Sequence, residues 1–140
     1  MVNFFFEDIN RLDLDQEFFI SWLGEVCNNE QRELDELSLI FCSDEYLLKI
    51  NKKYLKHDYY TDIITFNYSI TGIKGDLFIS TERVMENAEK QGVGFLNELY
   101  RVVAHGTLHL LGYTDKTAAE KEEMTQKENE ALSLIVSRET

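Results

Sequence analysis

The chain has 140 residues and a formal net charge of −12, with 44% hydrophobic and 29% charged residues. This length and composition are typical of one globular domain with a buried core, here residues 1–140. The strong negative charge excludes a broad, non-specific nucleic-acid binder, and no apolar run approaches the roughly 20 residues that span a bilayer.

The first third of the chain predicts a strand, a helix and a second strand. Residues 2–6 are rich in phenylalanine, residues 14–27 place apolar side chains at helical spacing, and residues 37–42 favour a strand. Cys27 and Cys42 fall in different elements without the spacing of a metal or redox site, so we expect two buried thiols. Because the N-terminus also lacks the features of a secretion signal, the expected location is the cytoplasm, with no membrane partner.

A stripe of lysines marks the next predicted helix, residues 45–56. Lys49, Lys52, Lys53 and Lys56 recur at i, i+3, i+4 and i+7, so an α-helix places all four on one face. In so acidic a chain, this lysine stripe is the candidate RNA-binding surface. The alternative is an ordinary solvated helix face.

The second half of the chain predicts a hairpin and then three helices. Residues 62–69 and 75–80 favour two antiparallel strands joined by a short loop. Apolar side chains at helical spacing then predict helices over about residues 81–92, 94–111 and 116–137. The order βαβαββααα indicates an α+β domain, with one mixed β-sheet of about four strands packed on about five helices.

Two histidines four residues apart, His105 and His109, lie in the predicted helix 94–111. Residues at i and i+4 share a helix face, so both imidazoles point the same way. Gly112 can end the helix in a left-handed turn, which would bring Asp115 back towards the rings. Two nitrogens, one carboxylate and an open position are typical of a catalytic zinc site, here at the end of a central helix. The alternative is a pair of packed or solvated histidines.

The residues around these histidines bear on the kind of hydrolase to expect. Metalloproteases with a helical histidine pair carry a glutamate directly after the first histidine, as the general base. Gly106 occupies that position here, which disfavours a small metallopeptidase. Glu98 lies two turns before His105, and we interpret it as an ion-pair partner of Arg101 rather than as a support for the metal site.

A longer pattern surrounds the histidines. Residues 105–115 read His-Gly-Thr-Leu-His-Leu-Leu-Gly-Tyr-Thr-Asp, and further matching positions lie upstream: Asn51, Tyr54, Asp58, Thr61, Asp62, Ile64, Phe66, Gly75, Asp76, Leu77, Ile79 and Ser80. Over residues 48–115 the chain resembles, in order and register, the YbeY family of bacterial metal-dependent endoribonucleases. That family has the pattern His-Gly-x-Leu-His-Leu-x-Gly-Tyr followed by a third metal ligand.

The chain departs from the family pattern at two positions that carry chemistry. The third metal ligand, usually histidine, is Asp115, a carboxylate that makes the site harder and less selective for zinc. Leu55 occupies the position of the arginine to which RNA contact or catalysis is ascribed in the family. Lys56 follows, but an ammonium does not reproduce the bidentate fork of a guanidinium. The catalytic residues therefore stay unassigned, with Lys56 and His57 as candidates.

The resemblance implies a single-strand endoribonuclease in 16S rRNA maturation and small ribosomal subunit biogenesis. It also implies one divalent metal ion, for which zinc is favoured, held by His105, His109 and Asp115. The implied partners are ribosomal RNA and the small ribosomal subunit with its proteins, which would supply the basic surface that this chain lacks. A non-cleaving, metal-stabilised assembly factor is an alternative that the loss of the arginine favours, and a metallopeptidase is a third. The attacking group, water or the 2′-hydroxyl of the RNA, stays open.

Overall fold

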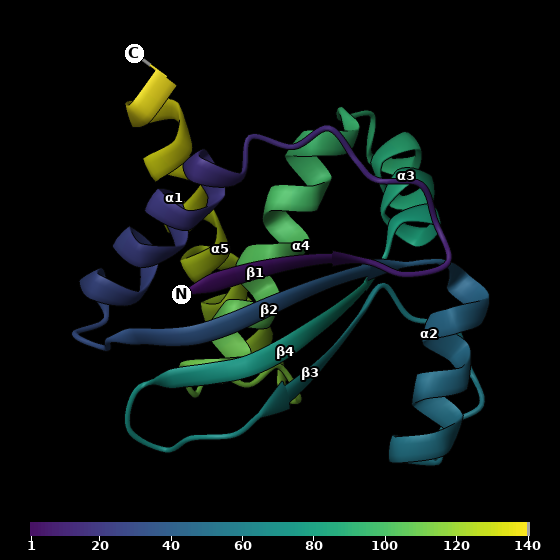
Figure 1. Ribbon diagram of the computed structural model, residues 1–140. Helices are drawn as coiled ribbons and strands as arrows, with labels where there is room; N and C mark the ends of the chain where they lie inside the picture. The colour runs from purple at the N-terminus through teal and green to yellow at the C-terminus, as the bar shows by residue number, and fades with distance from the viewer. Residues whose placement is uncertain (140) are drawn as a thin grey trace.

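One four-stranded sheet and the helices around it follow the predicted order of elements. The computed structural model describes residues 1–139 (Figure 1). In chain order the elements are β1 (Val2–Phe6), α1 (Gln16–Asn29), β2 (Leu34–Cys42), α2 (Asp44–Ile50), the π-helix η1 (Asn51–Leu55), β3 (Ile63–Asn67), β4 (Ile73–Ser80), α3 (Thr81–Gln91), α4 (Phe95–Leu110) and α5 (Ala118–Glu139).

The sheet has the strand order β1-β2-β4-β3. β1 runs parallel to β2, and β2 runs parallel to β4, whereas β3 is antiparallel to β4. The antiparallel pair is the predicted hairpin, with Ile63 opposite Ile79 and Asn67 opposite Gly75. The sheet is therefore mixed, which confirms the predicted α+β class with four strands and five α-helices.

The main core lies on one face of the sheet. Alternate residues of β2, among them Leu37, Leu39 and Phe41, are fully buried there against α1, α4 and α5. In Figure 1, α4 crosses behind the sheet, with α1 and α5 beside it. The indole Nε1 of the buried Trp22 donates a hydrogen bond of 2.8 Å to the Ala131 carbonyl, which ties α1 to α5. This packing fixes α4 and α5 against each other, and both helices contribute to the site described below.

The lysine helix is regular only over its first half. Ser43 begins α2 by accepting a hydrogen bond from the Tyr46 amide, as expected of an N-cap. The α-helix then ends at Ile50, and residues 51–55 form a π-turn that closes at Lys56 with φ +57°. Because π-turns bond i to i+5, the α-helical spacing assumed for the lysine stripe is wrong beyond Ile50. The four lysines are all exposed, but they do not lie along one α-helical face.

Both cysteines are buried, as predicted. Cys27 and Cys42 are free thiols in the described part of the chain. Burial raises the pKa of Cys27 to about 11 and that of Cys42 to about 12, so both thiols stay protonated and unreactive near neutral pH. Among the helices of residues 1–139, none is long and apolar enough to cross a bilayer.

Candidate metal centre

Helix α4 presents both histidines on the part of its surface that is not fully buried. From Val102 to Leu110 every residue except His105 and His109 is buried. The sheet, α3 and α5 surround the rest of the helix, so the two imidazoles share the remaining accessible strip. Their ring centroids are 4.5 Å apart. The i, i+4 spacing therefore places both rings side by side, as the helical pattern predicts.

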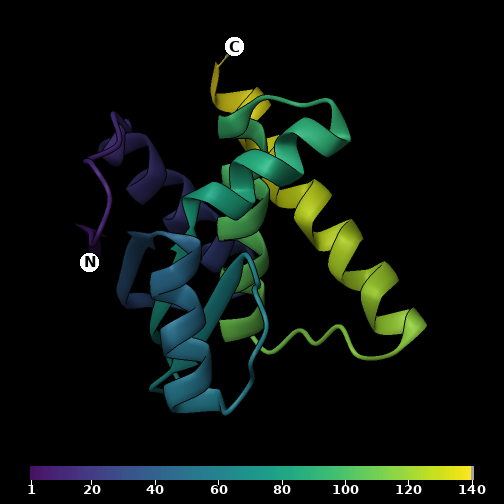
Figure 2. The same ribbon diagram turned by 90° about the vertical axis from the view of Figure 1, so that its right-hand side faces the viewer.

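The loop after α4 turns back because Gly112 adopts φ +105°, a conformation that favours glycine. The Gly112 amide donates to the His109 carbonyl and the Tyr113 amide donates to the Leu108 carbonyl, which caps the helix end. Figure 2 shows this loop leaving the end of α4 and running out to the start of α5. The reversal brings Asp115 back to the two histidines, as predicted.

The three side chains meet at the spacing of metal ligands. The Nε2 atoms of His105 and His109 are 3.0 Å apart, and the Asp115 Oδ2 atom lies 3.3 Å from the first and 3.6 Å from the second. Ligand atoms bound about 2.0–2.1 Å from a tetrahedral ion are roughly 3.3 Å from one another. The residues therefore fit one divalent metal ion in size as well as in donor type.

The second nitrogen of each imidazole is fixed by a neighbour. His109 Nδ1 lies 3.0 Å from the Tyr113 carbonyl oxygen, and His105 Nδ1 lies 2.7 Å from Glu128 Oε2. A carbonyl and an ionised carboxylate only accept, so both Nδ1 atoms donate, and Nε2 is the ring nitrogen left on each histidine to bind a metal ion. Partners of this kind orient the metal-binding histidines of known proteins.

The electrostatics of the Glu128–His105 pair support the hydrogen bond from His105 Nδ1 to Glu128. Burial lowers the pKa of His105, but the hydrogen bond and charge of Glu128, with Asp115 and Asp62 nearby, outweigh it and raise the pKa above its ordinary value. Burial raises the pKa of Glu128, but its bonds to His105 and Arg101 outweigh that effect and lower the pKa. Glu128 is therefore ionised at neutral pH and accepts the Nδ1 proton.

The predicted ion pair between Glu98 and Arg101 is wrong. Arg101 instead reaches α5, where it donates to Glu128 Oε1 at 2.9 Å and Asn129 Oδ1 at 3.0 Å. Glu98 is 4% exposed, and its Oε1 atom has no hydrogen-bond partner among the described residues. Burial, followed by repulsion from Asp62, raises its pKa. The arginine thus holds the carboxylate that orients His105, which sequence reasoning did not identify.

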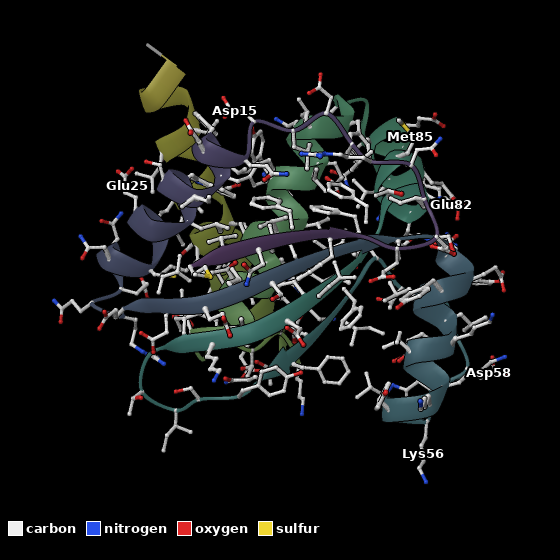
Figure 3. All side chains as sticks on the ribbon, viewed as in Figure 1. Asp15, Glu25, Lys56, Asp58, Glu82 and Met85 are labelled. Carbon is white, nitrogen blue, oxygen red and sulfur yellow. The ribbon has the colours of Figure 1, made fainter. Side chains whose placement is uncertain are left out.

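The three metal-ligand candidates open into a cleft of about 400 Å³. Leu55 and His57 also line this cleft, so one catalytic candidate shares it with the three metal-ligand candidates. Asn51 of the π-turn completes its wall together with residues of β3 and the preceding loop: Tyr59, Thr61, Asp62, Ile63, Ile64 and Thr65. Lys56 is not among the lining residues, and Figure 3 shows its side chain directed away from the molecule. Of the two catalytic candidates, only His57 is placed to meet a ligand in the cleft.

Gly106, where metalloproteases carry the general base, faces the sheet instead of the cleft. A Cβ atom at this position would lie 2.6 Å from Ile63 Cδ1 and 3.0 Å from Leu77 Cδ2. A glutamate here would force the side-chain ends of Ile63 and Leu77 to move, because α4 lies close to the sheet at this glycine. The same packing holds the histidine pair against β3.

Replacing Gly106 by alanine is expected to destabilise the protein. The overpacking cost of about 1–3 kcal/mol outweighs the gain in helix propensity of about 1 kcal/mol. Gly24 in α1 supplies a matched control, because a Cβ atom there meets nothing within 4 Å. Urea unfolding should therefore show a lower midpoint for Gly106→Ala and an unchanged or higher one for Gly24→Ala. Equal stabilisation of both variants would contradict the close packing of α4 on the sheet.

Known proteins resemble this chain in sequence and in fold. A family model described as Endoribonuclease YbeY matches residues 6–136. A Cytophaga hutchinsonii protein named Endoribonuclease YbeY is 52% identical over 134 residues, covering 94% of each chain. A Flavobacterium johnsoniae protein of the same name is 47% identical and covers 96% of this chain and 97% of its own. A Thermotoga maritima protein solved in solution shares the fold, with a TM-score of 0.66 at 24% identity over 99% of this chain and 93% of that one. The chain therefore belongs to the endoribonuclease YbeY family.

Proposed function

We propose that this protein is a metal-dependent, zinc-type endoribonuclease that cuts single-stranded RNA in 16S rRNA maturation and small ribosomal subunit biogenesis. One observation carries the proposal. His105, His109 and Asp115 converge at metal-ligand spacing at the edge of a cleft, in a chain whose relatives are named endoribonucleases. Ribosomal RNA and the small subunit with its proteins are the proposed partners, and the cytoplasm is the proposed location.

The chain's own residues would hold and orient the ion. His105 and His109 present their Nε2 atoms because Glu128 and the Tyr113 carbonyl occupy their Nδ1 atoms. Three protein ligands leave at least one coordination position open. When bound there, a divalent ion supplies a Lewis acid that neutralises charge on a phosphoryl oxygen and acidifies water. Two imidazoles and one carboxylate suit zinc, although this donor set also accepts other first-row ions.

We assign the lysine stripe as the surface that faces RNA or the ribosome. Lys49, Lys52, Lys53 and Lys56 are exposed on α2 and the π-turn, next to two residues that line the cleft, Leu55 and His57. Lys52 lies 3.4 Å from Asp58, a contact between exposed groups that contributes little. Local positive charge matters here because the chain as a whole repels phosphate.

Changing Lys52, Lys53 and Lys56 together to glutamate should weaken RNA binding and flatten its salt dependence. Each lost phosphate contact on a single strand lowers the slope of log affinity against log salt by about 0.7, so the slope should fall by about 2. Binding of a single-stranded RNA across a salt series measures this. A control with the same charge change elsewhere carries Lys74, Lys90 and Lys121 as glutamate, all exposed in the structure. Equal effects of both triple variants would show that the lysine stripe acts only through the net charge of the protein and is not a specific RNA-binding surface.

The function is tested with purified small subunits that carry precursor 16S rRNA. Zinc-loaded protein should cut the precursor, and a chelator should abolish the cut. The ends of the products identify the attacking group, since internal attack leaves a 2′,3′-cyclic phosphate and hydrolysis by water can leave a free hydroxyl. If the protein binds the subunits stably and makes no cut, the proposal of an enzyme gives way to that of a non-cleaving assembly factor. The observation that favours this second candidate is Leu55 in the cleft wall, where the family carries arginine.

A further inference from the structure

We propose that His57 and Tyr59 form a nucleobase-stacking subsite of the metal cleft, which receives an unpaired base of a single-stranded RNA. The inference rests on the proposed function, because it names the part of the substrate that the cleft holds beside the metal centre. The two rings stack on each other with centroids 5.2 Å apart and planes 20° apart. Both residues line the cleft that contains His105, His109 and Asp115.

The stacked pair is held in place before any ligand arrives. Asn51, in the π-turn, is 1% exposed, and its Nδ2 atom donates to the Tyr59 carbonyl at 2.9 Å. The Asn51 carbonyl accepts from the His57 amide at 3.2 Å. The Tyr59 hydroxyl and His57 Nδ1 are 3.0 Å apart, which joins the two side chains directly. A rigid aromatic platform loses little conformational entropy on binding, so more of the stacking energy is available for affinity.

Exposed apolar side chains gather at this end of the cleft. Tyr59 is 56% exposed and Leu55 is 40% exposed, and both line the cleft. Such a cluster next to a polar site is typical of a ligand-binding surface. An aromatic face stacks on any base, since every base has a π-face. The cluster therefore offers the planar contact that an unpaired base requires.

The charges of the cleft favour a base over a phosphate at this position. Among the described residues that line it, none is lysine or arginine, whereas Asp62 and Asp115 are carboxylates. A phosphate would therefore meet no fixed side-chain cation beside the stacked rings, and an uncharged base would meet no repulsion there. We accordingly expect the lysine stripe to contribute the salt-dependent part of affinity and the stacked pair to contribute the salt-independent part.

The subsite is tested by measuring the binding of a short single-stranded RNA that carries one 2-aminopurine. Tyr59→Ala should lower affinity by about 5- to 150-fold and abolish the quenching of 2-aminopurine that stacking causes. Tyr59→Phe keeps the planar ring but loses the hydrogen bond to His57, so it should keep the quenching and bind more tightly than Tyr59→Ala. Tyr59→Leu keeps apolar volume without a plane and should resemble alanine. The zinc content of all three variants should be unchanged, because Tyr59 is not one of the metal-ligand residues.

Two controls separate stacking from general effects. Tyr68→Ala removes a tyrosine that is 58% exposed in the β3–β4 hairpin, outside the residues lining the cleft, and should leave affinity unchanged. In a series of oligonucleotides, one abasic nucleotide is moved through successive positions. At one position, the abasic RNA should bind the unmodified protein as weakly as the intact RNA binds Tyr59→Ala. At that position the two changes should not add, because both remove the same contact.

The outcomes distinguish this inference from the proposed function. If the unmodified protein binds and cuts RNA while Tyr59→Ala binds equally well with equal quenching, the subsite is overturned and the endoribonuclease stands. If Tyr59→Ala does not fold, the comparison of Tyr59→Leu with Tyr59→Phe decides in the same way. If zinc-loaded, unmodified protein neither binds nor cuts single-stranded RNA, the proposed function fails and the subsite fails with it.

Discussion

Asp115→Ala should bind zinc at least about 100-fold more weakly than the unmodified protein, whereas Asp115→His should retain high affinity. Residues that only orient a metal ligand already contribute 10- to 100-fold to affinity, so the loss of a direct ligand costs more. Imidazole is an equal or better zinc donor than a carboxylate. The Gly112 turn, which brings position 115 to the histidines, is unchanged in both variants.

The affinities are measured by competition with a chromophoric zinc chelator at fixed pH. Asp13→Ala serves as a control, because Asp13 is an exposed acidic residue outside the metal-ligand group. Its affinity should equal that of the unmodified protein. Equal zinc affinity of Asp115→Ala and the unmodified protein would remove Asp115 from the ligand set, whatever its distance from the histidines.

Glu128→Gln should lower zinc affinity by about 10- to 100-fold without removing a ligand. The amide keeps the shape of the side chain but loses the charge that holds the Nδ1 proton of His105, at 2.7 Å. In metal-free protein, the same change should lower the pKa of His105, because burial then acts with less opposition. Glu130→Gln is the control, since Glu130 lies two residues further along α5, is 67% exposed and pairs with Lys127 instead of His105. An unchanged pKa of His105 by NMR titration would contradict the orienting role of Glu128.

The sign of the accompanying stability change follows from the two pKa shifts. His105 has a raised pKa, so its contribution is present below its ordinary pKa of 6.5 and is lost as pH rises through the folded value. Glu128 has a lowered pKa, so its contribution is present above 4.5 and is lost as pH falls through its folded value. Glu128→Gln should therefore destabilise metal-free protein most between about pH 4.5 and 6.5.

The metal-ligand candidates and the order of elements were accessible from local patterns. The i, i+4 histidines need only a helix to share a face, and Gly112 needs only its own backbone freedom to reverse the chain. Helix α3 likewise follows the predicted range 81–92, with Ser80 as its N-cap and Gly92 in the left-handed conformation at its end. Each of these features depends on residues within one or two turns of one another.

Features that depend on distant contacts were not accessible in the same way. Arg101 of α4 bonds to Glu128 of α5 rather than to Glu98 on its own helix. The packing of the two helices decides between these partners, and local spacing does not. The π-turn forms where Asn51 is buried and holds the following loop, which no local spacing encodes. Glu128 did leave a signal. It falls on the buried stripe of α5 with Met124 and Ala131, where a lone charged residue requires a partner.

The most direct test of the central claim is a titration of zinc into metal-free protein while the cleavage of a single-stranded RNA is followed. We expect activity to rise with added zinc and to saturate at one equivalent per chain. His105→Ala, purified in the same way, should show no activity at the same zinc concentration, which also excludes a contaminating nuclease. Full cleavage by the unmodified protein in excess chelator, or undiminished cleavage by His105→Ala, would contradict a metal-dependent endoribonuclease centred on His105, His109 and Asp115.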